Sequence, residues 1–113
     1  MRMKNIVSIL VCLFFVIVSN AARVDTIVVY SNAMHKNIKV AVVVPDHAAK
    51  QTGVKFPVVY LLHGYSGNYG SWLKDAPQLQ SRADQYQVML VCPDGGYGSW
   101  YYDSPINDPI KYE

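Results

Sequence analysis

The apolar positions of the chain fall into short runs that are separated by polar or glycine-rich stretches. Two runs rich in β-branched residues, 26–31 and 38–44, are joined by the short segment NAMHKN. Such a pair predicts two strands connected as an antiparallel hairpin. Pro45 closes the second run, and the stretch DHAAKQTGVKF after it is predicted to be a polar linker.

The next run, PVVYLL at 57–62, is apolar without alternation. A strand that is covered on both faces has this pattern, so we expect the run to form a central strand of a sheet. The run VMLVC at 88–92 predicts a second buried strand.

Between these strands, the segment 75–86 predicts a helix of about three turns. Asp75 is the expected N-cap, and Pro77 lies in the first turn. The apolar face of this helix consists of Ala76, Leu79, Ala83 and Tyr86. Strand, helix and strand with short connections form a βαβ unit, in which the strands are parallel and the crossover is right-handed.

Glycine and aromatic residues dominate the two segments that follow these strands, HGYSGNYGSW and PDGGYGSWYYDSP. The carboxyl ends of neighbouring parallel strands meet at one edge of a sheet, where α/β proteins bind their ligands. Glycines allow a close approach to the backbone, and aromatic rings line pockets. The two segments are therefore predicted to lie side by side around a pocket, although simple turns whose rings cover the strand ends are an alternative.

His63 and Gly64 directly follow the first of these strands. Acyl transfer requires N–H donors for the developing oxyanion, and in α/β-hydrolases one donor comes from the loop after the third strand, often with a His-Gly motif. This pattern predicts that Gly64 lets the backbone bend and that Tyr65 presents its N–H. A histidine that only forms hydrogen bonds at a strand end would give the same pair.

The stretches FPVVYLLHGYSGNYGSW, VMLVCPDGGYGSWYYDSP and SNAMHKNIKVAVVVP together resemble the amino-terminal part of the "Putative esterase" family. This group of α/β-hydrolases includes esterase D (S-formylglutathione hydrolase), tributyrin esterases, feruloyl esterase domains and mycolyltransferases. The resemblance implies an α/β fold, here an incomplete amino-terminal part of an α/β-hydrolase with a β-hairpin followed by a βαβ unit. It also implies a serine carboxylesterase that acts on a small-molecule or carbohydrate-linked ester and needs no cofactor or metal.

By the same resemblance, the backbone N–H of Tyr65 is one oxyanion donor, and the residue after the nucleophile provides the other. His63 and Gly64 belong to the substrate site. The loop with Trp100, Tyr101 and Asp103 lies beside the substrate cleft.

The catalytic triad of such an enzyme is not recognisable in the sequence. The nearest match to G-x-S-x-G is GYSGN at 64–68, but Asn68 replaces the last glycine and the motif follows the wrong strand. In this fold the histidine follows the serine and the acid along the chain, whereas His35, His47 and His63 all come early. We therefore expect an inactive fragment of a longer esterase, with the triad beyond Glu113.

The first 21 residues have the layout of a secretory signal peptide. A basic start, MRMKN, precedes an apolar core at 6–18 and the small residues of SNAA, and we predict cleavage after Ala21. The apolar core is shorter than the roughly 20 residues that cross a bilayer, which disfavours a membrane anchor. Residues 22–113 are thus predicted to be a secreted or periplasmic part of an esterase domain, without stable membrane insertion.

Removal of this leader changes the charge and the cysteine content. Ten Lys and Arg oppose eight Asp and Glu, and the loss of Arg2 and Lys4 leaves eight of each. Without a basic excess, nucleic acid is not an expected partner. Cys12 also leaves, so Cys92 has no intrachain disulfide partner and is predicted to be a buried thiol. The histidines are too scattered for a zinc site.

A different class of function is also compatible with the sequence. The chain could be an exported binding module that holds a carbohydrate or an apolar ligand on the aromatic residues Tyr65, Tyr69, Trp72, Trp100 and Tyr101. Acyl transfer to a sugar instead of water would use the same site as hydrolysis.

Overall fold

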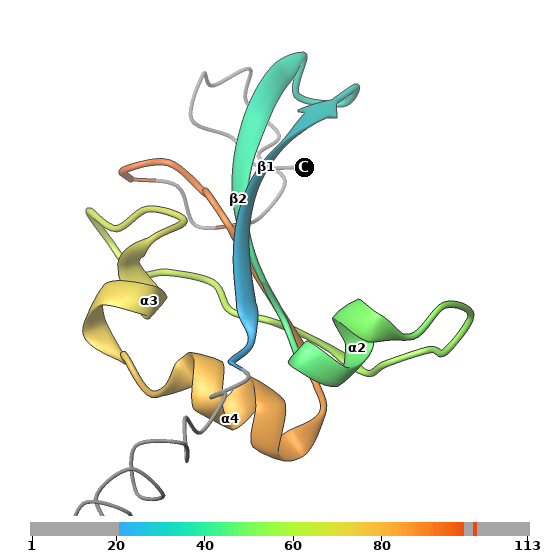
Figure 1. Cartoon of the computed structure of the whole chain (residues 1–113). Coiled ribbons are helices and arrows are strands. Elements are labelled where there is room, and N and C mark those ends of the chain that lie inside the picture. The colour runs from blue at the N-terminus through green and yellow to red at the C-terminus, as the bar shows by residue number, and fades with distance from the viewer. Residues whose placement is uncertain (1–20, 99–100, 102–113) are drawn as a thin grey trace, which may run out of the picture.

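A four-stranded sheet with the strand order β1-β2-β4-β3 organises the chain (Figure 1). The structure, a computed structural model, describes residues 21–98 and residue 101. β1 pairs with β2 and β2 pairs with β4 in antiparallel fashion, whereas β3 and β4 are parallel. The predicted hairpin and βαβ unit are thus confirmed. The strands are β1 (Arg23–Ser31), β2 (Lys36–Val44), β3 (Val58–Tyr60) and β4 (Met89–Pro93).

β2 is a central strand whose two faces both carry buried apolar side chains. Ile38 and Val40 are buried on one face, and Ala41 and Val43 are buried on the other. A strand with β-branched residues at most positions suits this environment, because its side chains pack on both sides of the pleated sheet. β2 therefore joins the other hairpin strand, β1, to β4 of the βαβ unit.

The segment between β2 and β3 contains a short helix, α2 (Asp46–Lys50), where the sequence predicted a polar linker. Two of its five residues are alanines, which favour helix formation. The Lys50 ammonium lies 2.7 Å from the Asp46 carboxylate one turn earlier, and such a pair supports a helix.

The predicted single helix at 75–86 is wrong in its first half. The structure has two helices here, α3 (Ser71–Asp75) and α4 (Leu79–Tyr86), with Asp75 at the end of the first one. Pro77 causes the break, since proline disfavours the helical conformation of the residue before it. Ala76 accordingly has φ and ψ of −131° and 74°.

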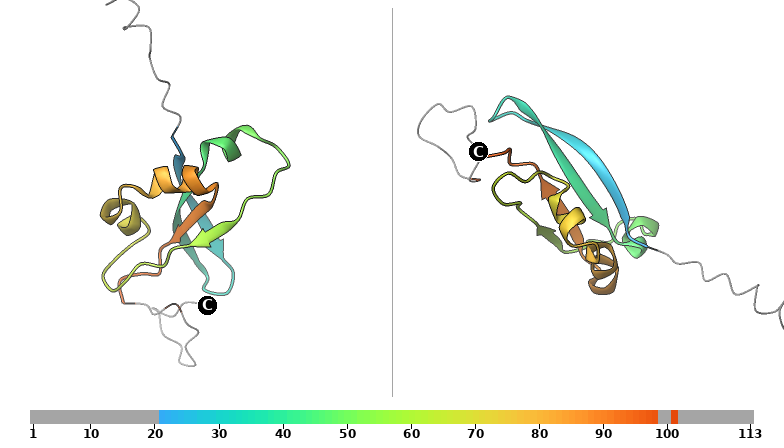
Figure 2. Two further views of the ribbon diagram at one scale, coloured as in Figure 1. Left: turned by 90° about the horizontal axis from the view of Figure 1, so that it is seen from below. Right: turned by 90° about the vertical axis from the view of Figure 1, so that its left-hand side faces the viewer.

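α4 packs across one face of the sheet, and α3 lies on the same side (Figure 2). Ala83 of α4 is fully buried against Val43 of β2 and Leu90 of β4, and Ala22 belongs to the same cluster. The predicted inner position of Tyr86 is wrong, because this side chain is 62% exposed. The small alanine lets the helix approach the sheet closely, so the core beneath α4 is compact.

β3 lies at the edge of the sheet among the described residues, not at its centre as predicted. Tyr60 is 67% exposed, and Val58 and Val59 are also exposed. Within residues 21–98 and 101, β3 pairs with β4 alone, and the core cluster beneath α4 is built on β2 and β4. An unpaired edge next to exposed valines is a surface prone to association.

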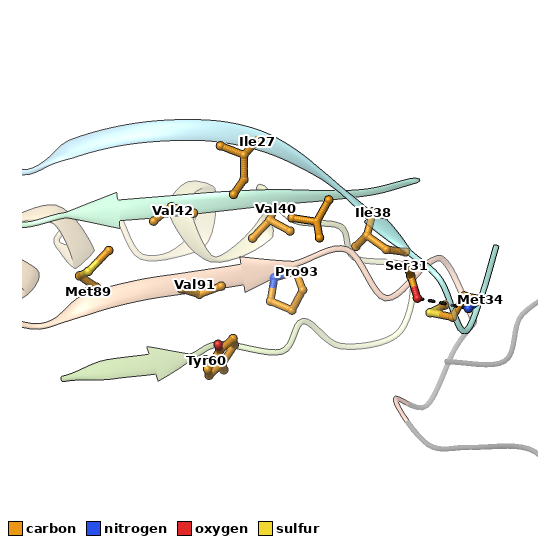
Figure 3. Close-up of a pocket in the computed structure, with 11 residues that line it drawn as sticks. Ile27, Ser31, Met34, Ile38, Val40, Val42, Tyr60, Met89, Val91 and Pro93 are labelled. Atoms are coloured by element: carbon orange, nitrogen blue, oxygen red, sulfur yellow. Dashed lines mark hydrogen bonds between the residues drawn. The ribbon is translucent and has the colours of Figure 1, made fainter. Parts of the chain in front are cut away.

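The other face of the sheet is hollowed and strongly apolar (Figure 3). A cavity of about 570 Å³ lies over it, and no described helix contributes to its walls. The lining comes from the strands and the hairpin turn: Ile27, Val29, Ser31, Met34, Ile38, Val40, Val42, Tyr60, Met89, Val91 and Pro93. In the part of the chain that the structure describes, no helix has the length and apolarity to span a bilayer.

Cys92 is buried in β4, as predicted. Burial raises the pKa of its thiol, because the thiolate is poorly solvated there. The protonated thiol favours the folded state below the unfolded pKa, and this contribution is lost as the pH rises through the folded pKa.

We expect Cys92 of the whole protein at pH 8 to react with iodoacetamide much more slowly in the native state than in urea. Equal rates, measured by mass spectrometry, would contradict this environment.

Candidate active site

His63 connects the two glycine-rich loops at the carboxyl edge of the sheet. Its side chain follows β3 and is buried, with the residue only 7% exposed. The Gly95 N–H, in the loop after β4, donates to His63 Nε2 at 2.9 Å. Nε2 therefore carries no proton, so Nδ1 is protonated and donates to the Gly64 carbonyl at 2.8 Å. Both ring nitrogens are thus occupied, and His63 is not placed to act as a general base.

Further contacts hold the two loops side by side, as the sequence predicted. The Ser66 N–H donates to the Tyr97 carbonyl at 2.9 Å, and the rings of Tyr65 and Tyr97 meet edge to face at 5.1 Å. The His63 N–H donates to the Tyr101 hydroxyl at 3.2 Å. The loops therefore form one connected unit rather than two separate turns.

The Tyr65 amide, the predicted oxyanion donor, has no hydrogen-bond acceptor among the described residues. The amides around it are occupied: Ser66 N–H binds the Tyr97 carbonyl, and Gly67 N–H binds the Gly64 carbonyl at 3.0 Å. Tyr65 as a whole residue is 74% exposed. Its role in oxyanion binding stays a prediction.

The sharp turn of the first loop occurs at Ser66 rather than at Gly64, which was expected to bend. Ser66 has a φ of +60°, a left-handed conformation that is uncommon for serine. Gly64 is outside this region, and a Cβ placed on it would meet nothing within 4 Å. Gly67 is the constrained glycine here, because a Cβ on it would lie 2.9 Å from His63 Nδ1.

Gly95 is closely packed against Tyr101, which no sequence motif indicated. A Cβ on Gly95 would overlap the Tyr101 ring, well inside van der Waals contact. The ring of Tyr101 also meets the His63 imidazole edge to face, with centroids 5.5 Å apart. The absence of a side chain at Gly95 thus allows His63 and Tyr101 to share one site.

We expect Gly95→Ala to destabilise the whole protein by about 1–3 kcal/mol, since the tyrosine ring must move to admit the methyl group. Chemical denaturation of the variant measures this loss. Gly98→Ala is the matched control, because a Cβ at Gly98 meets nothing within 4 Å. An equal effect of the two substitutions would contradict the packing described here.

The remaining aromatic residues of the first loop make contacts within the molecule. Trp72 Nε1–H donates to the Leu62 carbonyl at 3.0 Å, and the Lys39 ammonium lies 5.8 Å from the centroid of the Tyr69 ring. These two rings are therefore partly engaged in holding the loop. Trp100 and Asp103, which the resemblance placed beside the substrate cleft, lie outside the described residues.

Asp94 begins the second loop and forms a local turn. Its Oδ1 accepts the Gly96 N–H at 2.9 Å and lies 3.7 Å from His63 Nε2. A hollow of about 360 Å³ next to it is lined by Lys36, Asn37, Ile38, Lys39, Asp94 and Gly96.

Residues 21–98 and 101 contain no cluster of three or more His, Cys, Asp or Glu that could hold a metal ion. The described residues thus provide a buried histidine, His63, and a loop in which the Tyr65 N–H has no acceptor among them.

The model of a family described as "Putative esterase" matches residues 31–111, which is more than half of the chain. This chain belongs to the esterase family. The match includes both loops, so His63, Tyr65 and Gly95 all lie within the esterase-family region. A comparison with curated protein sequences finds no match.

Solved structures with the same fold include ferulic acid esterases and S-formylglutathione hydrolases. A ferulic acid esterase is 22% identical with a TM-score of 0.64, covering 74% of this chain and 36% of its own. A ferulic acid esterase from Anaeromyces mucronatus is 22% identical with a TM-score of 0.60, covering 83% and 36%. An S-formylglutathione hydrolase from Agrobacterium tumefaciens is 21% identical with a TM-score of 0.58, covering 79% and 31%. These likenesses confirm the predicted fold class, and the esterase-family chain spans about a third of each of these proteins.

Proposed function

We propose that the chain is the amino-terminal portion of a secreted serine carboxylesterase that hydrolyses an ester or thioester through an acyl-enzyme. Membership of the esterase family supports the hydrolase class. The observation that best supports the chemistry is the Tyr65 N–H, which has no acceptor among the described residues and follows a histidine held between two loops. The substrate is a small-molecule or carbohydrate-linked ester.

In the proposed reaction, a serine outside this sequence attacks the carbonyl carbon of the ester and passes its proton to a histidine. The carbonyl oxygen becomes an oxyanion, which accepts a hydrogen bond from the Tyr65 N–H and from the amide after the nucleophile. The alcohol leaves with the proton from the histidine, and an acyl-enzyme remains. Water then attacks the acyl carbon by the same route and releases the acid and the serine. This chemistry needs no cofactor or metal.

The described residues contribute the position of one donor to this reaction. His63 is fixed through Nε2 and Nδ1 to Gly95 and Gly64, so the backbone on both sides of Gly64 is restrained. A donor that is held before the substrate arrives needs no reorganisation during the reaction. We therefore assign His63 as a positioning residue rather than a catalytic one.

The experiment is to incubate the whole protein with a p-nitrophenyl ester and, separately, with a fluorophosphonate probe. We expect release of p-nitrophenol, its loss after labelling, and a single labelled serine beyond Glu113 in the peptide mass map. Labelling of Ser66 would overturn the assignment of the nucleophile. If the protein neither hydrolyses the ester nor reacts with the probe, the esterase proposal is overturned.

The exposed Tyr65 and Tyr97 rings support a second candidate, a non-catalytic binding module for a carbohydrate. Their edge-to-face pair presents apolar surface at the same edge of the sheet. This candidate predicts that an oligosaccharide binds the whole protein, with quenching of tryptophan fluorescence, while every ester tried stays intact. Turnover of an ester would exclude it, and an acylated sugar among the products would instead indicate acyl transfer.

A further inference from the structure

Ala22, the first residue after the predicted cleavage site, is held firmly by α4. Its backbone N–H donates to Asp84 Oδ2 at 2.6 Å, and its carbonyl accepts from Gln80 Nε2 at 3.1 Å. Its methyl group is part of the core cluster, and the residue is only 3% exposed. Ala21, on the other side of the bond to be cut, is exposed.

The Asp84 carboxylate has an unusual set of partners. Its second oxygen, Oδ1, accepts the Asp46 N–H at 2.7 Å, so both oxygens bind backbone amides. No ion pair joins Asp84 to another described residue; the described ion pairs include Arg23 with Asp25 and Lys50 with Asp46. A partly buried carboxylate that has only neutral donors lacks a counter-charge.

We propose that cleavage between Ala21 and Ala22 creates this counter-charge, so that the new amino terminus forms a structural ion pair with Asp84. Water adds to the Ala21 carbonyl carbon in a leader-processing endopeptidase, the C–N bond breaks, and Ala21 leaves as a carboxylate. The nitrogen of Ala22 takes up a proton and becomes an ammonium at the position that already lies 2.6 Å from Asp84 Oδ2. The inference rests on the proposed signal peptide.

Cleavage thereby changes a neutral amide donor into a charged one with three N–H groups. The hydrogen bond to the Asp84 carboxylate is already strengthened by the charge on its acceptor, and a charged donor adds direct Coulomb attraction between the two groups. Asp84 also binds the amino end of α2 through Asp46, so the same ion pair ties β1, α2 and α4 together. The exported, processed protein gains stability that the precursor lacks.

The test compares two forms of the whole protein, one that begins at Ala22 and one that begins at Ala21, each released from a fusion without extra residues. Both have one terminal ammonium, so the net charge is matched, but only the first places it at Asp84. We expect the Ala22 form to melt about 2–4 °C higher. The difference should disappear in the Asp84→Asn background, and it should fade above about pH 8, where an α-amino group loses its proton.

Equal melting temperatures of the two forms, or a difference that persists in Asp84→Asn, would overturn the ion pair. Because the first comparison changes no residue within 22–113, it remains informative even if Asp84→Asn fails to fold. Amino-terminal sequencing of the protein exported by a host tests the cut separately, and any terminus other than Ala22 would overturn it. Neither result depends on esterase activity, so the proposed function can fail independently.

Discussion

Replacing Tyr65 by proline is expected to lower the kcat of the whole protein for an activated ester about 100- to 1000-fold. Proline has no backbone N–H, so the variant lacks one of the two proposed oxyanion donors. Because the Tyr65 N–H binds no described residue, the substitution breaks no hydrogen bond within the described fold. The loss should therefore appear in kcat, with little change in KM, since the donor acts on the transition state.

Tyr65→Phe is the matched control because it keeps the N–H and the ring that contacts Tyr97. Its kcat should stay far closer to that of the natural protein than the kcat of the proline variant does. Denaturation curves of both variants show whether either one has lost its fold. A proline variant that is folded and has normal kcat would remove Tyr65 from the oxyanion site.

Replacing His63 by alanine is expected to destabilise the whole protein by about 2–4 kcal/mol. The substitution leaves a cavity beneath the loops and removes the acceptor of the buried Gly95 N–H. Since this side chain connects the two loops, ester turnover should fall together with stability. The free energy of unfolding from urea titration measures the first effect.

His47→Ala is the matched control for this change. His47 is exposed, and its ring contacts the Gln51 side chain one turn later in the sequence. Its removal should change the free energy of unfolding by no more than about 0.5 kcal/mol. If the two alanine variants were equally stable, the His63 side chain would not be what joins the loops.

The sequence predicted the elements that depend on local pattern. The runs at 26–31 and 38–44 are rich in β-branched residues and the run at 88–92 is apolar throughout, and the structure forms β1, β2 and β4 there. The parallel pairing of β3 and β4 followed from the short helical connection between them. The closeness of the two glycine-rich loops then followed from that topology, without any contact being known.

The predictions were wrong where a local sequence pattern did not by itself decide the structure. Pro77 is compatible with the first turn of a helix, but it also forces Ala76 out of the helical region and divides the segment. The apolar run before His63 indicated a strand covered on both faces, a property that depends on what packs against the strand. Burial of a strand is therefore not decided by its own residues.

The candidate site was only partly predictable for a related reason. His63 and Tyr65 belong to a recognisable short motif, and the motif located the loop. The packing of Gly95 under Tyr101 depends on residues that are distant from His63 in sequence, and the left-handed Ser66 has no signature, since serine rarely adopts that conformation. Such features arise from tertiary packing rather than from residue type.

The bond from Trp72 Nε1–H to the Leu62 carbonyl gives the esterase-family loop its own spectroscopic label. The indole N–H marks the point where β3 runs into the loop, one residue before His63. In a ¹⁵N-labelled sample its resonance should move when an ester analogue binds the Tyr65 amide, three residues after Leu62 in the chain. Occupancy could thus be followed without attaching any dye.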